Sequence, residues 1–294
     1  WRAGQKAQTD FQSLLKEKGR EILDKLEREK KKAIVIIGRP YNTFDSGANV
    51  SMPRKIAEMG YSVIPMDFLP FEPEKAGDEY HNLFWSYGQR IVSALQYIRR
   101  QKNLFAIYFT NFNCGPDSFL LSYAEQIMGE KPFLVITLDE HGADTGYMTR
   151  LEAFLDVVKG YEFRKEDTTI PRPLETPDVF RKRTIWFPPM HPFGTPLFAA
   201  AFQGFGYHAE ALPTEDREAF EMGRSATRGD ECLPAVVTVG GFLKKLKEIN
   251  ADPGEHAFFM PTSTGPCRLG QYALLHRMIL NAKGYGDVPI MSPS

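Results

Sequence analysis

The chain has few cysteines, no excess of charge and no long apolar run. Three cysteines in 294 residues are an odd, sparse count, which argues against a disulfide framework and for a reducing, cytoplasmic setting. Its 36 Lys and Arg balance 37 Asp and Glu, so nothing in the net charge would attract nucleic acid or an anionic membrane. No apolar run approaches the roughly 20 residues of a membrane-spanning helix, and no signal peptide or GxxxxGK[ST] phosphate loop is present.

The remaining composition is that of a globular protein. Hydrophobic residues make up 43% and charged residues 25% of the chain, which is long enough for two cores of ordinary size. The sequence begins at Trp1 without Met and ends at Ser294 just after an apolar stretch. We therefore expect it to be a piece of a larger polypeptide.

Apolar runs alternate with amphipathic stretches along the whole chain. Residues 11–32 predict a charged N-terminal helix. Four strands are predicted in the first half (33–37, 62–66, 104–109 and 133–138), separated by helices at 53–59, 81–100, 117–128 and 147–158. Four further strands (184–187, 208–212, 257–260 and 288–291) alternate with helices at 198–202, 215–221, 233–249 and 269–282. Parallel strands need crossover helices, so this order predicts an α/β fold.

We expect two doubly wound, Rossmann-like parallel-sheet domains. The predicted boundaries are an N-terminal helix over 1–32, a first domain over 33–160, a Pro-rich linker over 161–183 and a second domain over 184–294. Ligands of open α/β sheets bind beyond the carboxyl ends of the strands. We therefore expect the two domains to face each other across a cleft.

The three cysteines occupy similar places in this pattern. Cys114, Cys232 and Cys267 each stand in a Gly/Pro-punctuated turn just before a predicted helix, and Cys114 and Cys267 also follow a predicted strand. A thiol at such a turn faces free N–H groups and the positive end of a helix dipole, which favours the thiolate. Scattered cysteines can equally be small buried hydrophobes. Their shared position favours the interpretation as metal or cluster ligands.

The spacing bears on the kind of metal. A structural zinc site wants four protein ligands, often in close CxxC pairs, whereas the gaps here are 118 and 35 residues and no His or second Cys lies within four positions of any cysteine. A cubane [4Fe–4S] cluster brings its own sulfides and fits three thiolates, with one iron left open to water or substrate.

Other polar residues follow the predicted strands. Arg39, Tyr41 and Asn42 follow the first strand, where a phosphate or acyl-CoA group could bind; a loop that merely caps the next helix is the alternative. Glu140 and His141 follow the fourth strand and are candidates for acid–base catalysis. Arg150 is a candidate substrate-binding residue, although it could instead pair with a carboxylate of its own helix.

Several motifs resemble one known group of proteins. They are GRPYN at 38–42, NCGPDS at 113–118, DEHGADTGYMTRLEAFLD at 139–156 and TGPCRLG at 264–270. Together they resemble the 2-hydroxyacyl-CoA dehydratase and double-cubane-cluster superfamily, and within it the dehydratase-like part of large acyl-CoA dehydratase activase-related proteins. The resemblance covers nearly all of the chain after residue 32.

The resemblance implies an oxygen-sensitive iron–sulfur protein with its cluster at Cys114, Cys232 and Cys267. It also implies electrons supplied at very low potential by an activator ATPase that carries its own [4Fe–4S] cluster, in trans or on the same parent polypeptide. A homodimer and a small-molecule or acyl-CoA substrate are further expectations. A double-cubane [8Fe–9S] cluster needs more than three thiolates, so it would have to be shared between two chains or be absent.

Two classes of function remain open from the sequence. The first is a reductase or dehydratase component that passes single electrons from its cluster to a bound substrate. The second is a non-catalytic iron–sulfur relay or scaffold module of a larger protein. A zinc-bound or metal-free protein that binds a small ligand is more remote, and an iron and sulfide assay separates it from the other two.

Overall fold

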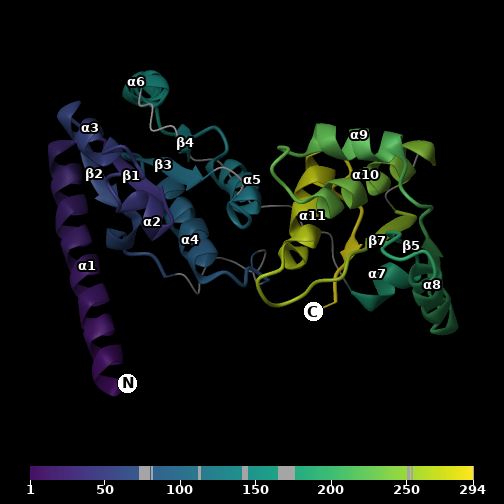
Figure 1. The fold of residues 1–294 in the computed structure, drawn as a ribbon. Helices are drawn as coiled ribbons and strands as arrows, with labels where there is room; N and C mark the ends of the chain where they lie inside the picture. Colours follow the sequence, from purple (N-terminus) through teal and green to yellow (C-terminus); the bar gives the residue numbers. More distant parts are fainter. Residues whose placement is uncertain are drawn as a thin grey trace. The chain divides into compact units, whose positions relative to one another are not determined.

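The computed structural model describes residues 1–72, 80, 82–111, 114–140, 145–164, 176–249, 252 and 254–293. It contains two four-stranded sheets in which every neighbouring pair is parallel (Figure 1). The α/β fold class with two Rossmann-like sheets and an N-terminal helix is confirmed. No helix in the described ranges combines the length and the hydropathy that crossing a membrane requires.

Two compact units divide the chain. The first comprises Trp1–Gly77 and Ser86–Thr168, and the second comprises Asp78–Trp85 and Thr169–Ser294. A short segment from within the first half of the sequence therefore belongs to the second unit. The predicted domain boundaries 33–160 and 184–294, with a cleft between the domains, stay a prediction.

The first unit is built on a sheet with the order β2-β1-β3-β4. Every residue of β1 is buried, as expected of a central parallel strand covered on both faces. Its elements are α1 (Arg2–Glu29), β1 (Ala33–Gly38), α2 (Pro40–Thr43), α3 (Met52–Glu58), β2 (Ser62–Pro65), the 3₁₀ helix η1 (Met66–Phe68), α4 (Ser86–Arg100), β3 (Leu104–Asn111), α5 (Asp117–Met128), β4 (Phe133–Leu138) and α6 (Thr145–Gly160).

The helices cover this sheet on both faces. Ile34 and Phe105 belong to a buried cluster with residues of α3 and α6. The side chains that alternate with them point to the opposite face, where α4 and α5 pack against each other and α4 contacts β3. Alternation along each strand therefore divides the core between two layers of helices.

Helix α1 is longer at its N-terminus than the sequence pattern predicts, because residues 2–10 lack the apolar periodicity on which that prediction depends. It ends at Glu29 and is capped by Lys30, which adopts a left-handed conformation (φ 53°) and donates its N–H to carbonyls of the last turn. Gly19 lies against η1, and a Cβ atom there would stand 1.7 Å from the Phe68 carbonyl oxygen. The absent side chain lets α1 and η1 approach closely.

The second unit repeats the same strand order. Its sheet is β6-β5-β7-β8, so in both sheets the first strand in sequence lies between the second and the third. The elements are α7 (Pro177–Arg181), β5 (Thr184–Phe187), α8 (Gly194–Gly204), β6 (His208–Ala211), α9 (Arg217–Ala226), α10 (Leu233–Glu248), β7 (His256–Phe259), the 3₁₀ helix η4 (Arg268–Gln271), α11 (Tyr272–Ala282) and β8 (Ile290–Met291). Helix α7 lies within the predicted linker.

Aromatic rings fill both faces of this second sheet. Phe187 stacks on Phe259 with ring centroids 4.4 Å apart, on the side covered by α7 and α8. On the other side of the sheet, Phe242 of α10 stacks on Phe258, with the ring centroids 3.9 Å apart. The segment from the first half of the sequence joins this unit through Gln271, whose Nε2 donates to the Asn82 carbonyl oxygen at 2.6 Å.

Helices α9 and α10 touch through glycines. A Cβ on Gly240 would lie 1.8 Å from the Ala219 carbonyl oxygen, and one on Gly223 would lie 1.9 Å from that of Val236. These atoms are backbone and cannot rotate away, so the two helices are close only because both positions lack a side chain.

The neighbouring Gly241 provides a matched control for this contact. Its Cβ would meet only side-chain atoms, the nearest being Glu215 Cγ at 3.5 Å. We expect Gly240→Ala to lower the free energy of unfolding by about 2 kcal/mol or more, because α9 and α10 must separate. Gly241→Ala should raise it by up to about 1 kcal/mol through helix propensity. Urea titration followed by the tryptophan fluorescence of the chain measures both; equal effects of the two variants would contradict the close packing.

Candidate functional site

The carboxyl edge of the first sheet brings Arg39 and the Cys114 turn together. Strands β1 and β3 are neighbours, with Gly38 paired to Phe109, and each is followed at this edge by one of the predicted site residues. Gly38 has φ 141°, and a Cβ there would lie 2.4 Å from the Phe109 carbonyl oxygen. Only glycine fits this turn, which carries the chain from β1 into Arg39.

A buried ion pair organises this edge. Arg39 Nε lies 3.3 Å from Asp117 Oδ1, and the Asp117 side chain is 1% exposed. Thr110 donates its hydroxyl to the other carboxylate oxygen, Asp117 Oδ2, at 2.6 Å. Asp117 begins α5, where the helix dipole also favours a negative charge. Burial acts to lower the pKa of Arg39, but Asp117 and Cys114 raise it more, so the guanidinium stays charged.

Cys114 is half-buried in the turn that leads into α5. Its N–H donates to the Asn111 carbonyl oxygen at 3.2 Å, and its own carbonyl oxygen accepts from Ser118 N at 3.1 Å. Burial raises the pKa of the Cys114 thiol, and the Asp117 carboxylate raises it further. The expectation that the turn favours the thiolate is therefore wrong for Cys114 in the metal-free chain, because burial and a neighbouring negative charge outweigh the helix dipole. Metal binding here would have to release a proton.

The residues of α2 line the same edge. The pKa of Tyr41 is raised by burial and then by Cys114, which places the phenol near the thiol. Asn42 is fully buried and donates its amide to Asn111 Oδ1, while Asn49 Nδ2 donates to the Asn42 and Thr43 carbonyl oxygens, each at 3.1 Å. Asn42 therefore holds β1, β3 and the α2 turn together, which is a structural role.

One donor of Arg39 has no partner in the described part of the chain. Its Nη2 is buried and has no hydrogen-bond partner among the described residues. Buried polar groups in folded proteins nearly always have a partner. An unpaired guanidinium nitrogen beside a cysteine marks a place where a ligand atom could accept a hydrogen bond.

The other predicted substrate and catalytic residues lie on or after β4. Arg150 of α6 donates Nη2 to the Val135 carbonyl oxygen in the middle of β4 at 2.6 Å. Strand β4 is the last strand of its sheet, so Arg150 covers a carbonyl that no further strand pairs with. Glu140 is exposed after β4, and His141 lies outside the described residues. Roles for Glu140 and His141 in catalysis stay a prediction.

The second unit brings the other two cysteines to one tyrosine. Cys232 precedes α10 and Cys267 precedes η4, and both have an extended backbone (φ −67° in each, ψ 142° and 135°). Cys232 Sγ lies 2.7 Å from the Tyr272 hydroxyl. Burial, then Cys232, then Cys267 raise the pKa of Tyr272, and the hydroxyl is in contact with Cys232.

His276, one turn further along α11, connects Tyr272 to α10. It is fully buried, its ring centroid lies 5.9 Å from that of Tyr272, and its Nε2 lies 3.1 Å from the Ala235 carbonyl oxygen and 3.3 Å from Thr238 Oγ1. The Phe242 ring packs edge to face against the His276 ring, with the ring centroids 5.4 Å apart. The two-cysteine region therefore rests on a packed α10–α11 interface.

All three cysteines are free thiols. Cys114 belongs to the first unit and the other two to the second. Among the described residues, no group of three or more His, Cys, Asp or Glu side chains is placed to hold a metal ion. Convergence of the three thiols on one cluster stays a prediction. The chemistry of the donors, three free thiols, fits a three-thiolate cluster.

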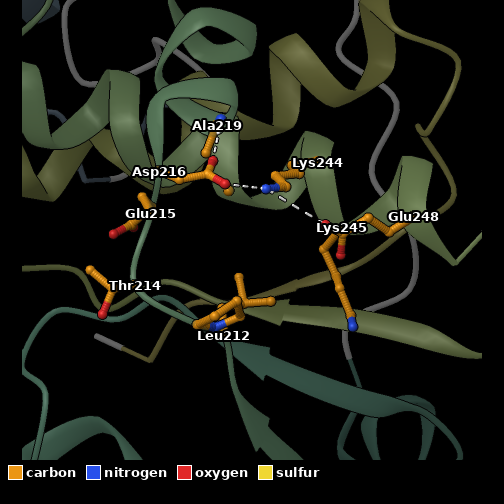
Figure 2. A pocket seen from close by; sticks show the side chains of 10 residues that line it. Leu212, Thr214, Glu215, Asp216, Ala219, Lys244, Lys245 and Glu248 are labelled. Carbon is orange, nitrogen blue, oxygen red and sulfur yellow. Dashed lines mark hydrogen bonds and ion pairs between the residues drawn. The ribbon is translucent and has the colours of Figure 1, made fainter.

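A cavity of about 120 Å³ in the second unit is a different feature (Figure 2). It lies between the end of β6 and helices α9 and α10, and none of the predicted site residues lines it. Asp216 accepts from Ala219 N at 3.0 Å and pairs with Lys244, while Lys245 Nζ lies 4.1 Å from the Trp186 ring centroid. Lys244 also pairs with Glu248 of its own helix, and burial raises the pKa of Glu215, another acid of the lining. The ion pair between Asp216 and Lys244 connects the start of α9 to α10.

Sequence reasoning missed Thr110, Asp117 and Tyr272 as members of these sites. Asp117 is the first residue of α5, and its ion pair to Arg39 depends on β1 and β3 being neighbours. The one available signal for Tyr272 was its position five residues after Cys267. Nothing in the sequence relates it to Cys232.

Comparison with known proteins gives one partial match. A family model described as a CoA enzyme activase uncharacterised domain matches residues 1–69. The match covers α1 to η1 and includes Arg39, Tyr41 and Asn42, but none of the cysteines. No curated protein and no solved structure matches the chain.

The buried ion pair gives a prediction about stability. We expect Asp117→Asn to lower the free energy of unfolding by about 3 kcal/mol, because it leaves the largely buried Arg39 guanidinium without its counter-charge. Glu221→Gln is the control: its partner Arg217 is 91% exposed, and such surface pairs contribute at most about 0.5 kcal/mol on a helix. Urea titration measures both, and an equally small effect of the two variants would contradict the organising role of Asp117.

His276 gives a prediction about pH. Burial lowers its pKa from 6.5 to about 4, so between these values the unfolded chain binds a proton that the native chain does not. The contribution of His276 to the free energy of unfolding is therefore fully present above pH 6.5. It is lost as the pH is lowered towards 4, by up to about 3 kcal/mol.

The variant His276→Gln should lose this part of the pH dependence, measured as the free energy of unfolding at pH 7, 6, 5 and about 4. The exposed His208 supplies the control, since His208→Gln should keep the wild-type slope. The same slope in His276→Gln as in wild type would show that His276 is not the titrating group.

Proposed function

We propose that this chain is an iron–sulfur protein that accepts electrons in an ATP-dependent, low-potential electron-transfer system. Cys114, Cys232 and Cys267 would hold one [4Fe–4S]-type cluster, with one iron left without a cysteine ligand. Such a cluster, when bound, supplies one-electron redox chemistry and an open coordination position.

One observation carries the proposal: each of the three cysteines stands at the entry to a helix. Cys114 leads into α5, Cys232 into α10 and Cys267 into η4 and α11. Free N–H groups at helix starts stabilise the negative charge of thiolate-bound clusters, and at Cys114 this effect acts against burial and the Asp117 carboxylate. Cys232 contacts Tyr272, and both Cys232 and Cys267 raise its pKa, which supports a common region for two of the three proposed ligands.

The electron source would be a separate activator ATPase with its own cluster, in trans or on the same parent polypeptide. The chain has no GxxxxGK[ST] loop with which to bind ATP itself. The match of residues 1–69 to a CoA enzyme activase domain supports a place in such a system. A homodimer, and a double cubane shared between two chains, extend the same proposal.

A substrate would bind at the carboxyl edge of the first sheet. Arg39 offers there a buried donor that no described residue accepts from, and Tyr41 is the exposed neighbour of Cys114. A guanidinium suits a carbonyl, carboxylate or phosphate oxygen, so an acyl-CoA or another small molecule with such a group is the proposed ligand. Asn42 and Arg150 have structural hydrogen bonds and would contribute less.

The test is reduction of the reconstituted protein. Purified without oxygen, or reconstituted with iron and sulfide, the chain should bind about four irons and four sulfides. An activator ATPase of the dehydratase type, supplied with dithionite, should reduce the cluster with ATP but not with ADP, as followed by EPR. The variants Cys114→Ser, Cys232→Ser and Cys267→Ser should each lose most of the iron, and Ser225→Ala is the matched surface control.

Three results would count against parts of this proposal. Equal reduction with ATP and ADP would leave the chain as a simple relay. Full iron content in any one of the three serine variants would remove that cysteine from the ligand set. Zinc in place of iron and sulfide after anaerobic purification would overturn the cluster itself.

A further inference from the structure

We propose that Tyr272 is a positioning residue that donates a hydrogen bond to the sulfur of Cys232 and thereby raises the reduction potential of the bound cluster. The inference rests on the proposed function, because it concerns the environment of one proposed cluster ligand. It adds a residue to which neither the sequence motifs nor the family match points.

The contact is short and comes from two different helices. The Tyr272 hydroxyl lies 2.7 Å from Cys232 Sγ, with Tyr272 at the start of α11 and Cys232 just before α10. In a free thiol either atom can be the donor. A cysteine that ligates iron is a thiolate and has no proton, so in the loaded protein the phenol must be the donor.

The phenol is held in place by its surroundings. Tyr272 is 6% exposed, and its ring lies beside that of the fully buried His276, which bonds back to α10 through the Ala235 carbonyl oxygen. Phe242 of α10 packs against the same histidine and stacks on Phe258 of β7. The hydroxyl is therefore fixed relative to Cys232 by packed side chains, and the hydrogen bond requires little reorganisation.

The direction of the effect follows from charge. Reduction adds an electron to the cluster, and part of the added negative charge resides on the ligand sulfurs. A hydrogen bond to a sulfur stabilises the more negative state, so it raises the reduction potential.

The experiment compares Tyr272→Phe with wild type and with Tyr207→Phe. Tyr207 is in the same unit, and its ring packs against Phe202 and Arg181, so its variant controls for the loss of a hydroxyl away from the cysteines. Each protein is reconstituted, assayed for iron and sulfide, and titrated potentiometrically by EPR. We expect all three to bind equal iron, Tyr272→Phe to have a more negative potential, and Tyr207→Phe to match wild type.

A second measurement uses the iron-free protein. Alkylation of each cysteine by iodoacetamide at about pH 9.5, where free thiols are largely ionised, is followed by mass spectrometry. A hydrogen-bonded thiolate is the weaker nucleophile, so Tyr272→Phe should alkylate Cys232 about fivefold faster, the factor expected for loss of one hydrogen bond. The rate at Cys114 should stay unchanged in both variants.

These measurements separate the inference from the proposed function. A full complement of iron with an unchanged potential in Tyr272→Phe overturns the role of Tyr272 and leaves the cluster intact. Wild-type protein without iron and sulfide overturns the cluster and the redox role with it, and the alkylation rate then still decides whether Tyr272 bonds to Cys232. An equal shift in Tyr207→Phe would show that loss of any hydroxyl in this unit has the same effect, which also overturns the assignment.

Discussion

Parallel strand pairing is the constraint on which both units depend. A strand that pairs in parallel with its neighbour must be followed by a crossover, so every strand of a sheet ends at the same edge. In each unit the first strand in sequence lies between the second and the third. The loops after the first and third strands are therefore neighbours, and these loops carry Arg39 and Cys114 in one unit. In the other unit the loop after the third strand carries Cys267.

The two units use different means to fix their cysteine loops. In the first, a buried ion pair between Arg39 and Asp117 connects the end of β1 to the start of α5, so the charge pair determines how the turn around Cys114 is held. In the second, aromatic packing at the α10–α11 interface has this role, together with the polar contacts of Cys232 with Tyr272 and of His276 with the Ala235 carbonyl oxygen. A buried ion pair therefore fixes the cysteine turn of the first unit, and mainly apolar packing fixes the cysteine turns of the second.

Much of the fold could be predicted from the sequence, because buried parallel strands are short apolar runs that are easy to see. The run from Ala33 to Ile37 and the run from Leu104 to Phe109 match observed strands within two residues. Helix α2 was not predicted, since four residues have no periodicity to detect. The expected helix at 81–100 is wrong at its start: residues 82–85 form a turn and irregular backbone, and α4 begins at Ser86. Residue 81 lies outside the described residues.

The site was predictable only one residue at a time. Arg39, Tyr41 and Cys114 could be chosen because each follows an apolar run at a turn. Their partners could not, because Asp117 and Tyr272 gain their roles from contacts between elements far apart in sequence. A single sequence contains the turn chemistry but not the pairing of β1 with β3, or of α10 with α11.

The short segment Asp78–Trp85 has a consequence for how the chain is made. It packs with the second unit, where Asn82 accepts a hydrogen bond from Gln271, 189 residues later in the sequence. At a translation rate of roughly 5–20 residues per second, Asn82 would leave the ribosome about 10–40 s before its partner. During that interval Tyr80 and Leu83, both buried in the finished protein, have no completed second unit to cover them. The order of synthesis therefore leaves the apolar side chains of Tyr80 and Leu83 uncovered on the nascent chain, where a chaperone or another chain could bind them before the second unit is complete.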